Sequence, residues 1–261
     1  MVTFEAGDVA LTIDPSCGAR ISSLRVGDLE LIVGPIEGEP FHWGCYPMAP
    51  WAGRVRDRKL QFEGKTYPFP INMDTHAIHG TTYDRPWQQQ GETPVFVCDL
   101  GEHWPFPGYA LQRFNLTPEG LTLSLEVHAE SASFPAACGW HPWFPRQLAR
   151  GGEALLNFKA DAMYQRLPDF VIDGTLTTPP PEGPWDDCFT QVQQPVQITW
   201  PNALHLDITS DTQDWVVYNM PVNAMCVEPM TGPPDAINIR PRLVTPNNPL
   251  TAEMRFSWQR F

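Results

Sequence analysis

Apolar and polar residues alternate with a period of two along much of this 261-residue chain, and this alternation constrains the fold more than any other feature. The clearest example is residues 111–127, where two alternating runs flank the sequence from Thr117 to Gly120. Successive side chains of a β-strand point to opposite faces, so the pattern predicts two strands joined by a short turn. Helical periodicity is confined to short windows, of which residues 160–167 are the best.

Similar alternating runs recur along the rest of the chain. They cover residues 9–13, 196–200, 204–208, 225–228 and 254–258. Between them lie turn-forming breakers, drawn from the 29 Pro and 19 Gly of the chain. Many short strands with such dense breakers predict an all-β fold, either a sandwich or a barrel-like sheet assembly. All-β domains of this length commonly stay single, so we expect one domain over residues 1–261, with the Pro-rich residues 177–184 as a long loop within it.

The charge balance excludes two classes of partner. The chain carries 17 basic and 30 acidic residues, a formal net charge of −13. Nucleic acids and anionic membrane surfaces both attract concentrated Lys and Arg, so we expect no nucleic acid and no membrane partner. Residues 1–10 hold no Lys or Arg and no long apolar run, so we do not expect a secretory signal there. The six Cys lie far apart without a C-x-x-C pair, which favours reduced thiols in a cytoplasmic protein.

Tryptophan is abundant, and several of the ten Trp lie beside polar residues. Examples are His42-Trp43, Trp140-His141-Pro142-Trp143 and Trp185-Asp186. A single Trp is usually a large core residue. The repeated pairing with polar groups is typical of a carbohydrate site, where an aromatic face stacks on a sugar and polar groups hydrogen-bond its hydroxyls.

Five short segments contain the residue types that carry out chemistry. Their candidate residues are Arg54, His76 and His79, His141, Asp186 and Asp187, and Glu228. Each also has an ordinary explanation: a surface ion pair for the Arg, a buried core residue for the His, a turn for the adjacent acids. Two His three residues apart, with no third His or Cys nearby in sequence, are weak evidence for a metal, and we expect none.

The last segment places its carboxylate on a strand. Val227 is expected to face away from Cys226 and Glu228, because side chains alternate along a strand. Pro229 has no N–H and is expected to end the ladder, which would leave Glu228 at a strand end beside a stiff loop. Such a carboxylate is either functional or a solvated strand end.

Taken in order, these segments resemble the aldose 1-epimerase (galactose mutarotase) family. The likeness runs from Ser16 to Asn238, and its most specific piece is Glu-Pro-Met-Thr-Gly-Pro-Pro-Asp-Ala-Ile-Asn at residues 228–238. The resemblance implies a large antiparallel β-sandwich with a carbohydrate site on a concave sheet and no cofactor. Family members interconvert the α and β anomers of free aldoses.

The resemblance also implies roles for single residues. By matching position, Glu228 is similar to the family's general base and His141 to its general acid. Three others are similar to its sugar-binding residues: Arg54, His79 and Asp186. We expect one or more of the nearby Trp to stack on the sugar ring, and the candidates are Trp43, Trp51, Trp140 and Trp143, of which Trp143 is assigned to the site.

Two departures from the family pattern affect these assignments. Gly80 is followed by Thr81 and Thr82, where the family often has Gly-Gly after the first His. Asp187 lies beside Asp186, so either acid could face the sugar.

Anomer exchange requires a base and an acid on opposite sides of a hemiacetal. The C1 hydroxyl loses a proton while the ring oxygen gains one. With reference pKa values near ~4.3 for Glu and ~6.5 for His, Glu228 can be ionised while a useful fraction of His141 is protonated near neutral pH. Positioned proton transfer is typically worth about 10²–10⁴-fold.

Three alternatives stay open from the sequence. The chain could bind carbohydrate without turnover, since fold does not decide function. It could be a glycoside hydrolase in which Asp186 and Glu228 form the carboxylate pair. It could also act on a sulfonated or phosphorylated hexose, which would require a cationic pocket, and the candidates for it are Arg20, Arg56, Arg58, Lys59 and Arg240. The exposed strand edges of a sandwich permit a homodimer.

Overall fold

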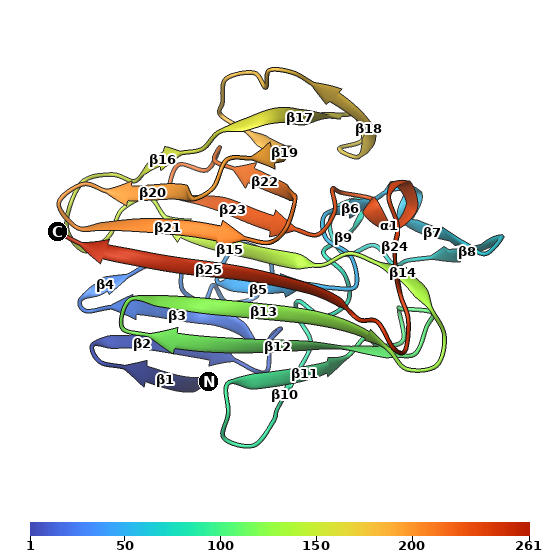
Figure 1. Ribbon diagram of the computed structural model, residues 1–261, viewed down its shortest axis with the longest axis horizontal. Coiled ribbons are helices and arrows are strands. Elements are labelled where there is room, and N and C mark those ends of the chain that lie inside the picture. Colours follow the sequence, from blue (N-terminus) through green and yellow to red (C-terminus); the bar gives the residue numbers. More distant parts are fainter.

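Two large antiparallel sheets form the body of the protein in the computed structural model, which describes residues 1–261 (Figure 1). The first sheet has eleven strands: β1 (Val2–Ala6), β2 (Val9–Asp14), β3 (Arg20–Val26), β4 (Leu29–Glu30), β5 (Cys45–Met48), β15 (Gly139–Pro145), β17 (Ala160–Arg166), β18 (Ile172–Thr177), β19 (Asp186–Val192), β22 (Asp214–Tyr218) and β23 (Ala224–Met230). Their order across the sheet is β1-β2-β3-β5-β15-β23-β22-β19-β17-β18, with β4 paired to β3. The expected all-β fold with large antiparallel sheets is confirmed.

The second sheet has eight strands: β10 (Gln88–Gln89), β11 (Val95–Asp99), β12 (Gly108–Thr117), β13 (Gly120–Ala129), β16 (Leu155–Asn157), β20 (Val196–Trp200), β21 (Leu204–Ser210) and β25 (Leu250–Arg260). Small elements complete the chain: η1 (Arg56–Arg58), α1 (Ala236–Ile239), and the strand pairs β6 (Arg54–Val55) with β9 (Ala77–Ile78), β7 (Lys59–Phe62) with β8 (Lys65–Pro68), and β14 (Phe134–Ala136) with β24 (Arg242–Val244). No helix is long and apolar enough to cross a bilayer.

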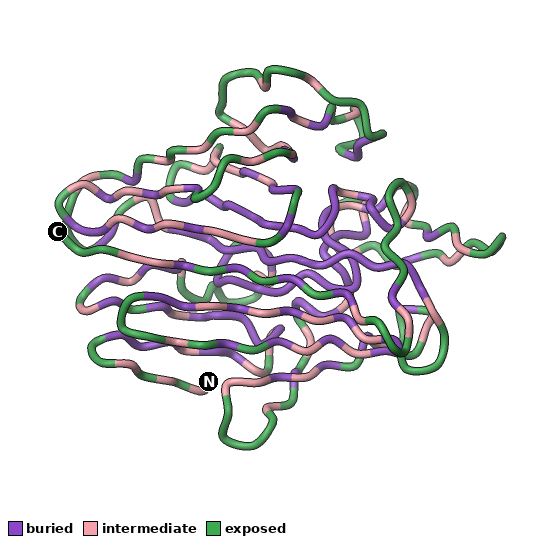
Figure 2. Tube along the Cα trace, in the orientation of Figure 1, coloured by how far each residue is buried: buried purple, intermediate pink, exposed green.

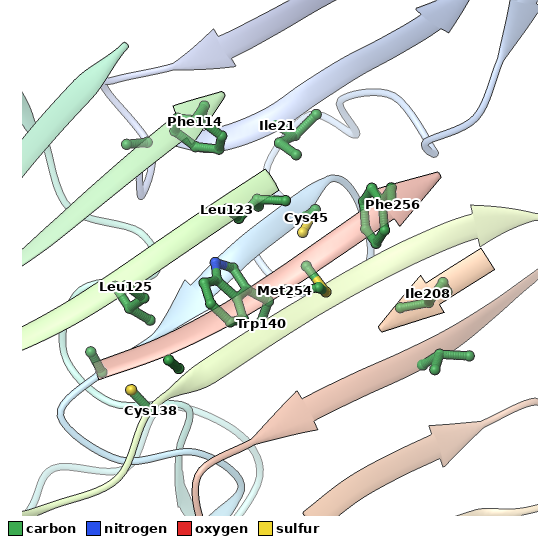
Figure 3. Close-up of a cluster of buried hydrophobic side chains, with 14 of the residues drawn as sticks. Ile21, Cys45, Phe114, Leu123, Leu125, Cys138, Trp140, Ile208, Met254 and Phe256 are labelled. Carbon is green, nitrogen blue, oxygen red and sulfur yellow. The ribbon is translucent and has the colours of Figure 1, made fainter. Parts of the chain in front are cut away.

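Apolar side chains from both sheets pack into one core. A cluster of 54 buried residues combines, for example, Ile21 of β3 with Phe114 of β12 and Met254 of β25 (Figure 3). Trp140 spans this core, and its Nε1 donates a hydrogen bond of 2.8 Å to Oε1 of Gln112. Burial of this apolar area is the main force that holds the sheets together.

The central strands of the first sheet are buried on both faces. All seven residues of β23 are buried, and so are the first six of β15 (Figure 2). One face contributes to the main core, and the other, which includes Tyr46 and Cys226, forms a second cluster of 13 buried residues. Val227 belongs to the main core and Cys226 to the second cluster, which confirms that they face opposite sides.

All of the predicted strands are present. Strands β12 and β13 form the expected hairpin, with Thr117 paired to Gly120, and β20 covers the predicted residues 196–200. All six Cys are free thiols. Residues 160–167, the best of the short helical windows, do not form a helix, and Ala160–Arg166 folds as strand β17 between β18 and β19.

Pro229 does not end its strand. β23 continues to Met230, and Pro229 pairs with Trp215 of β22. On its other side, β23 pairs with β15 at Gly139–Met230 and again from Trp143–Cys226 onward, and the ladder is interrupted between these pairs. Pro142 and Pro229 lie within the interruption, where their missing N–H groups cannot contribute to a ladder. Proline therefore loosens this pairing locally instead of terminating the strand.

Candidate active site

All six candidate site residues line one pocket over the second-cluster face of the first sheet. They are Arg54, His79, His141, Trp143, Asp186 and Glu228. The cavity has a volume of about 160 Å³. Pockets for drug-sized ligands measure about 300–1,000 Å³, so this one suits a single small molecule.

His141 and Glu228 lie across the interrupted ladder between β15 and β23. Continuing the antiparallel register from the Gly139–Met230 pair by two residues on each strand sets His141 opposite Glu228. Nε2 of His141 lies 3.3 Å from Oε1 of Glu228, and the two residues are 6% and 2% exposed. An acid–base pair is thus held on two rigid central strands at the floor of the pocket.

Burial shifts both groups of this pair toward their neutral forms. It raises the pKa of Glu228 well above its ordinary value, and nearby Asp186 adds to this, while Arg54 opposes it. It lowers the pKa of His141 well below 6.5, and the neighbouring His79 contributes. Two groups in such close contact titrate as one unit with two macroscopic pKa values. At any pH between these two values, the pair holds a single proton. That proton can reside on Glu228 or on His141.

Aromatic neighbours hold the ring of His141. Tyr46 stacks on one side with a centroid distance of 4.8 Å, and Trp143 stacks at 5.3 Å with its plane tilted by 13°. His79 meets the same ring edge-on at 5.1 Å. Nδ1 of His141 is buried without a hydrogen-bond partner, so aromatic packing and the Glu228 contact fix the ring orientation.

His79 and Arg54 are positioned by the short pair β6–β9, in which Arg54 pairs with Ile78. His79 adopts a left-handed conformation (φ 60°), and its Nδ1 accepts a hydrogen bond of 3.3 Å from the backbone N–H of Gly53. Burial, together with the charge of Arg54, lowers the pKa of His79 to about 3. His79 is therefore neutral at ordinary pH, and since Nδ1 accepts, Nε2 carries the proton and can donate to a ligand.

The glycine after His79 is required by a close backbone approach. Gly80 has φ +82°, and a Cβ there would lie 2.0 Å from the carbonyl oxygen of Ala49. The departure from the family pattern at Thr81 and Thr82 leaves this glycine in place. The hydroxyls of these two residues hydrogen-bond the carbonyl oxygens of Leu100 and Ala49.

Asp186 and Asp187 both line the pocket, and both lie beside Arg166. Nη1 of Arg166 donates to the Asp186 carboxylate at 2.9 Å and to its carbonyl oxygen at 2.7 Å. Burial raises the pKa of Asp186, although Arg166 opposes this. Alternation along β19 puts Asp186 on the same face as Cys188, which belongs to the second cluster, and Asp186 is the acid whose charge acts on Glu228.

Three of the four Trp named as candidates to stack on a sugar lie outside the pocket. Trp140 points into the main core (Figure 3), because alternation places it opposite to His141 and Trp143 on β15. Trp51 stacks on Phe69 at 4.5 Å within the main core. Trp43 packs on the guanidinium of Arg20, 4.2 Å from its ring centre. Trp143 is the one of the four that lines the pocket.

The five basic residues named as candidates for a cationic pocket, which an anionic sugar would require, do not line this site. Arg20 is fully buried and donates to backbone carbonyls, while Arg240 pairs with Asp214 and Arg56 approaches Asp235. Arg58 and Lys59 line a different cavity. The cationic residues of the pocket itself are Arg54 and Arg166.

Several pocket residues carry no sequence signal that singles them out. They are Phe41, Tyr46, Tyr164, Arg166, Phe170 and Tyr218. Alternation could have placed Tyr218 on the same face of β22 as Val216, but strand pairing across the sheet is needed to bring either near Glu228. Phe170 follows a Pro-Asp breaker and would be read as an ordinary turn residue.

One group of side chains has the composition of a metal site. The ligand atoms of His141, Cys226 and Glu228 lie within 4.8 Å of one another. Burial raises the pKa of Cys226 well above its ordinary value, and Glu228 adds to this, so its thiol is protonated at neutral pH. A metal would have to displace that proton, since thiolate is the ligand form.

Comparison with known proteins identifies one family. A model of the family described as aldose 1-epimerase matches residues 2–257. Two Escherichia coli K12 proteins described as uncharacterized are similar in sequence. YihR is 26% identical over 91% of this chain and 85% of its own length, and YphB is 32% identical over 39% of this chain and 37% of its own length.

Solved structures share the fold. A putative aldose 1-epimerase from E. coli K12 superposes with a TM-score of 0.84 at 18% identity, covering 99% of this chain and 98% of that one. A galactose mutarotase-like protein from Clostridium acetobutylicum gives 0.83 at 16% identity, over 99% and 95%. A galactose 1-epimerase from Lactobacillus acidophilus gives 0.78 at 13% identity, over 99% and 93%.

Proposed function

The chain belongs to the aldose 1-epimerase family, and from this premise we propose that it interconverts the α and β anomers of a free, uncharged hexose. The observation that carries the proposal is the buried contact between His141 and Glu228 in a pocket of single-sugar size.

We also propose that residues 1–261 act as one domain, because the 54-residue core draws on strands from both ends of the chain.

Ring opening uses the pair in its charged form. The Glu228 carboxylate takes the proton of the C1 hydroxyl while Nε2–H of His141 protonates the ring oxygen. The bond between C1 and the ring oxygen breaks, which leaves an open-chain aldehyde and a free C5 hydroxyl. After the aldehyde turns about the C1–C2 bond, the reverse transfers close the ring and restore both groups.

The buried environment fits the energetics of this sequence. After ring opening, Glu228 is protonated and His141 is neutral, which is the form that burial favours for both groups. The pair holds one proton before and after the step, so no proton has to enter from solvent. The environment that raises one pKa and lowers the other thus favours the two proton transfers once the pair is in its charged form.

The remaining pocket residues bind and orient the sugar. Nε2–H of His79 donates to a hydroxyl, the guanidinium of Arg54 donates to others, and the Asp186 carboxylate accepts. Nε of Arg54 is buried without a hydrogen-bond partner, which leaves it available to a ligand oxygen. Trp143 provides an aromatic face beside His141.

The charges of the pocket favour a neutral sugar over an anionic one. Two cationic residues line it, Arg54 and Arg166, against three carboxylates. Arg166 is already paired with Asp186 and approaches Asp187 at 3.6 Å. A phosphate or sulfonate would therefore lie near carboxylates with a single unpaired guanidinium to compensate.

Exchange NMR between anomers tests the proposal and the choice of sugar together. Glucose, galactose and a 6-sulfonated hexose are compared with and without the protein. We expect faster exchange for a neutral hexose and little effect on the sulfonated one. Acceleration confined to the sulfonated sugar would overturn the neutral-substrate proposal, and binding of every sugar without faster exchange would indicate a carbohydrate-binding protein.

A further inference from the structure

Phe170 lies at the tip of a hairpin that arches beside the pocket. Strands β17 and β18 pair antiparallel, with Arg166 opposite Ile172 at the base of the turn. Within the turn, the backbone N–H of Leu167 donates a hydrogen bond of 2.8 Å to the carbonyl oxygen of Val171. The backbone N–H of Phe170 donates one of 2.9 Å to the carbonyl oxygen of Leu167. These bonds define the turn, so the position of Phe170 is set by the backbone.

The conformation of Phe170 is costly in two ways. It has φ 62°, in a left-handed region that bulky side chains rarely adopt. It is also 48% exposed although it is a large apolar residue. Backbone strain of this kind is concentrated at functional sites. A polar residue or glycine would satisfy the turn more easily, so the aromatic ring has to be explained by what it contacts.

The ring contacts a guanidinium from each side of the pocket. The central carbon of the Arg54 guanidinium lies 5.2 Å from its centre, and that of Arg166 lies at the same distance. Contacts of this length are within the range of cation–π attraction. His76 meets the ring edge-on at 6.4 Å.

Those two guanidiniums belong to opposite parts of the proposed sugar site. Arg54 comes from β6, and Arg166 holds the carboxylate of Asp186. The hairpin is also tied to the β6 side directly, because Nη2 of Arg56 donates to the carbonyl of Ile172 at 2.7 Å. Phe170 thus bridges the two groups of hydroxyl-binding residues, with one part of its ring in the pocket and the rest in solvent.

We propose that Phe170 is a specificity-determining residue, which closes the outer end of the pocket and restricts it to a single sugar ring. This inference rests on the proposed function of the same site. The aromatic face packs against the sugar, keeps Arg54 turned toward its hydroxyls, and supports Arg166 where it holds the Asp186 carboxylate. A second sugar unit attached to the first would have to occupy the space that the ring fills.

Three variants separate this role from a structural one. Phe170→Tyr keeps the aromatic face, Phe170→Leu keeps an apolar side chain without it, and Phe170→Asn removes the apolar group but suits the left-handed turn. For each, exchange kinetics are measured on the preferred hexose and on a reducing disaccharide that carries this hexose at its reducing end. Thermal unfolding of each variant shows that the fold is retained.

For Phe170→Asn we expect the KM for the hexose to rise about 10-fold with kcat nearly unchanged, since a binding contact and not the proton transfer is removed. The preference for the hexose over the disaccharide should fall by a similar factor. Phe170→Tyr should behave like the wild type and Phe170→Leu should lie between. Equal changes for both sugars, or a loss of kcat at constant KM, would overturn the proposal.

Calorimetric binding of the same sugars distinguishes failure of this inference from failure of the proposed function. If the wild type binds hexose without catalysing exchange, the proposed activity is wrong. Even then, Phe170→Asn should bind the hexose more weakly than the wild type does, and its binding of the disaccharide should improve relative to its binding of the hexose. If the variants bind both sugars as the wild type does, Phe170 is not a specificity residue, whatever the activity.

Discussion

Oε1 of Glu228 lies 3.3 Å from Nε2 of His141, across the one stretch where the ladder between β15 and β23 is interrupted. A proline accompanies each side chain, Pro142 after His141 and Pro229 after Glu228. Prolines donate no ladder hydrogen bonds, so the two strands pair above and below this point but not at it. The interruption lies between two central strands, and there the two functional groups meet at the floor of the pocket.

The pH profile of anomer exchange should be broad. The active form of the pair holds one proton, so activity falls when a second is gained or the last is lost. Burial lowers the pKa of His141, so the pair gains a second proton only at low pH. Burial raises the pKa of Glu228, so the pair loses its last proton only at high pH. We expect full activity through pH 6.5. Rates that decline on the alkaline side near pH 6.5 would contradict this.

His79 should make the protein less stable in acid. Its pKa is about 3 in the folded state against 6.5 for a free residue, so the unfolded state binds the proton more readily. Stability is therefore lost as the pH falls from 6.5 toward 3, by at most about 5 kcal/mol. Urea unfolding of wild type and His79→Gln at several pH values measures this. The difference between them should change with pH over this window, and a constant difference would refute the prediction.

Gly80→Ala should destabilise the fold, because its Cβ would collide with the carbonyl of Ala49 and its φ is positive. The free energy of unfolding should fall by about 2–4 kcal/mol. Gly34→Ala is the matched control, since nothing lies within 4 Å of a Cβ there, and its effect should stay within about 0.5 kcal/mol. Equal stability of the two variants would show that the close approach at Gly80 is unimportant.

Removal of metals should leave exchange activity unchanged, because the proposed steps use side-chain protons alone. The measurement compares protein dialysed against a chelator with untreated protein, at matched concentration. The metal content of both samples is determined in parallel. If chelation abolished activity and added metal restored it, the group formed by His141, Cys226 and Glu228 would be a metal centre and the proposed mechanism would be wrong.

Local patterns predicted much of the fold. Period-two alternation located the β12–β13 hairpin and gave both ends of β20 correctly. It succeeded because one face of each of these strands lies in the core and the opposite face is more polar. The weak helical periodicity of residues 160–167 does not decide their structure, because pairing with β18 and β19 holds them in strand β17. Pro229 was misread for a similar reason, since a strand with two neighbours can lose pairing to one and keep the other.

The candidate site was partly accessible from the sequence. The family resemblance pointed to five residues, and the pairing of Trp with polar residues pointed to Trp143; the fold brings all six to one pocket. Alternation along β15 could have excluded Trp140 from the side of His141, but it could not have excluded Trp43 or Trp51, which lie in irregular segments. Phe170 and Tyr164 were inaccessible, because the hairpin of β17 and β18 approaches the pocket through tertiary packing alone.

The most direct test of the account compares Glu228→Gln with the wild type in anomer exchange and in sugar binding. The amide keeps the shape of the side chain but cannot accept the C1 proton, so exchange should fall by about 10²–10⁴-fold while the Kd for sugar changes by only a few-fold. Cys226→Ser, a neighbour on the same strand face, is the matched control and should retain exchange. Exchange at the wild-type rate in Glu228→Gln would contradict the central claim that this carboxylate is the base.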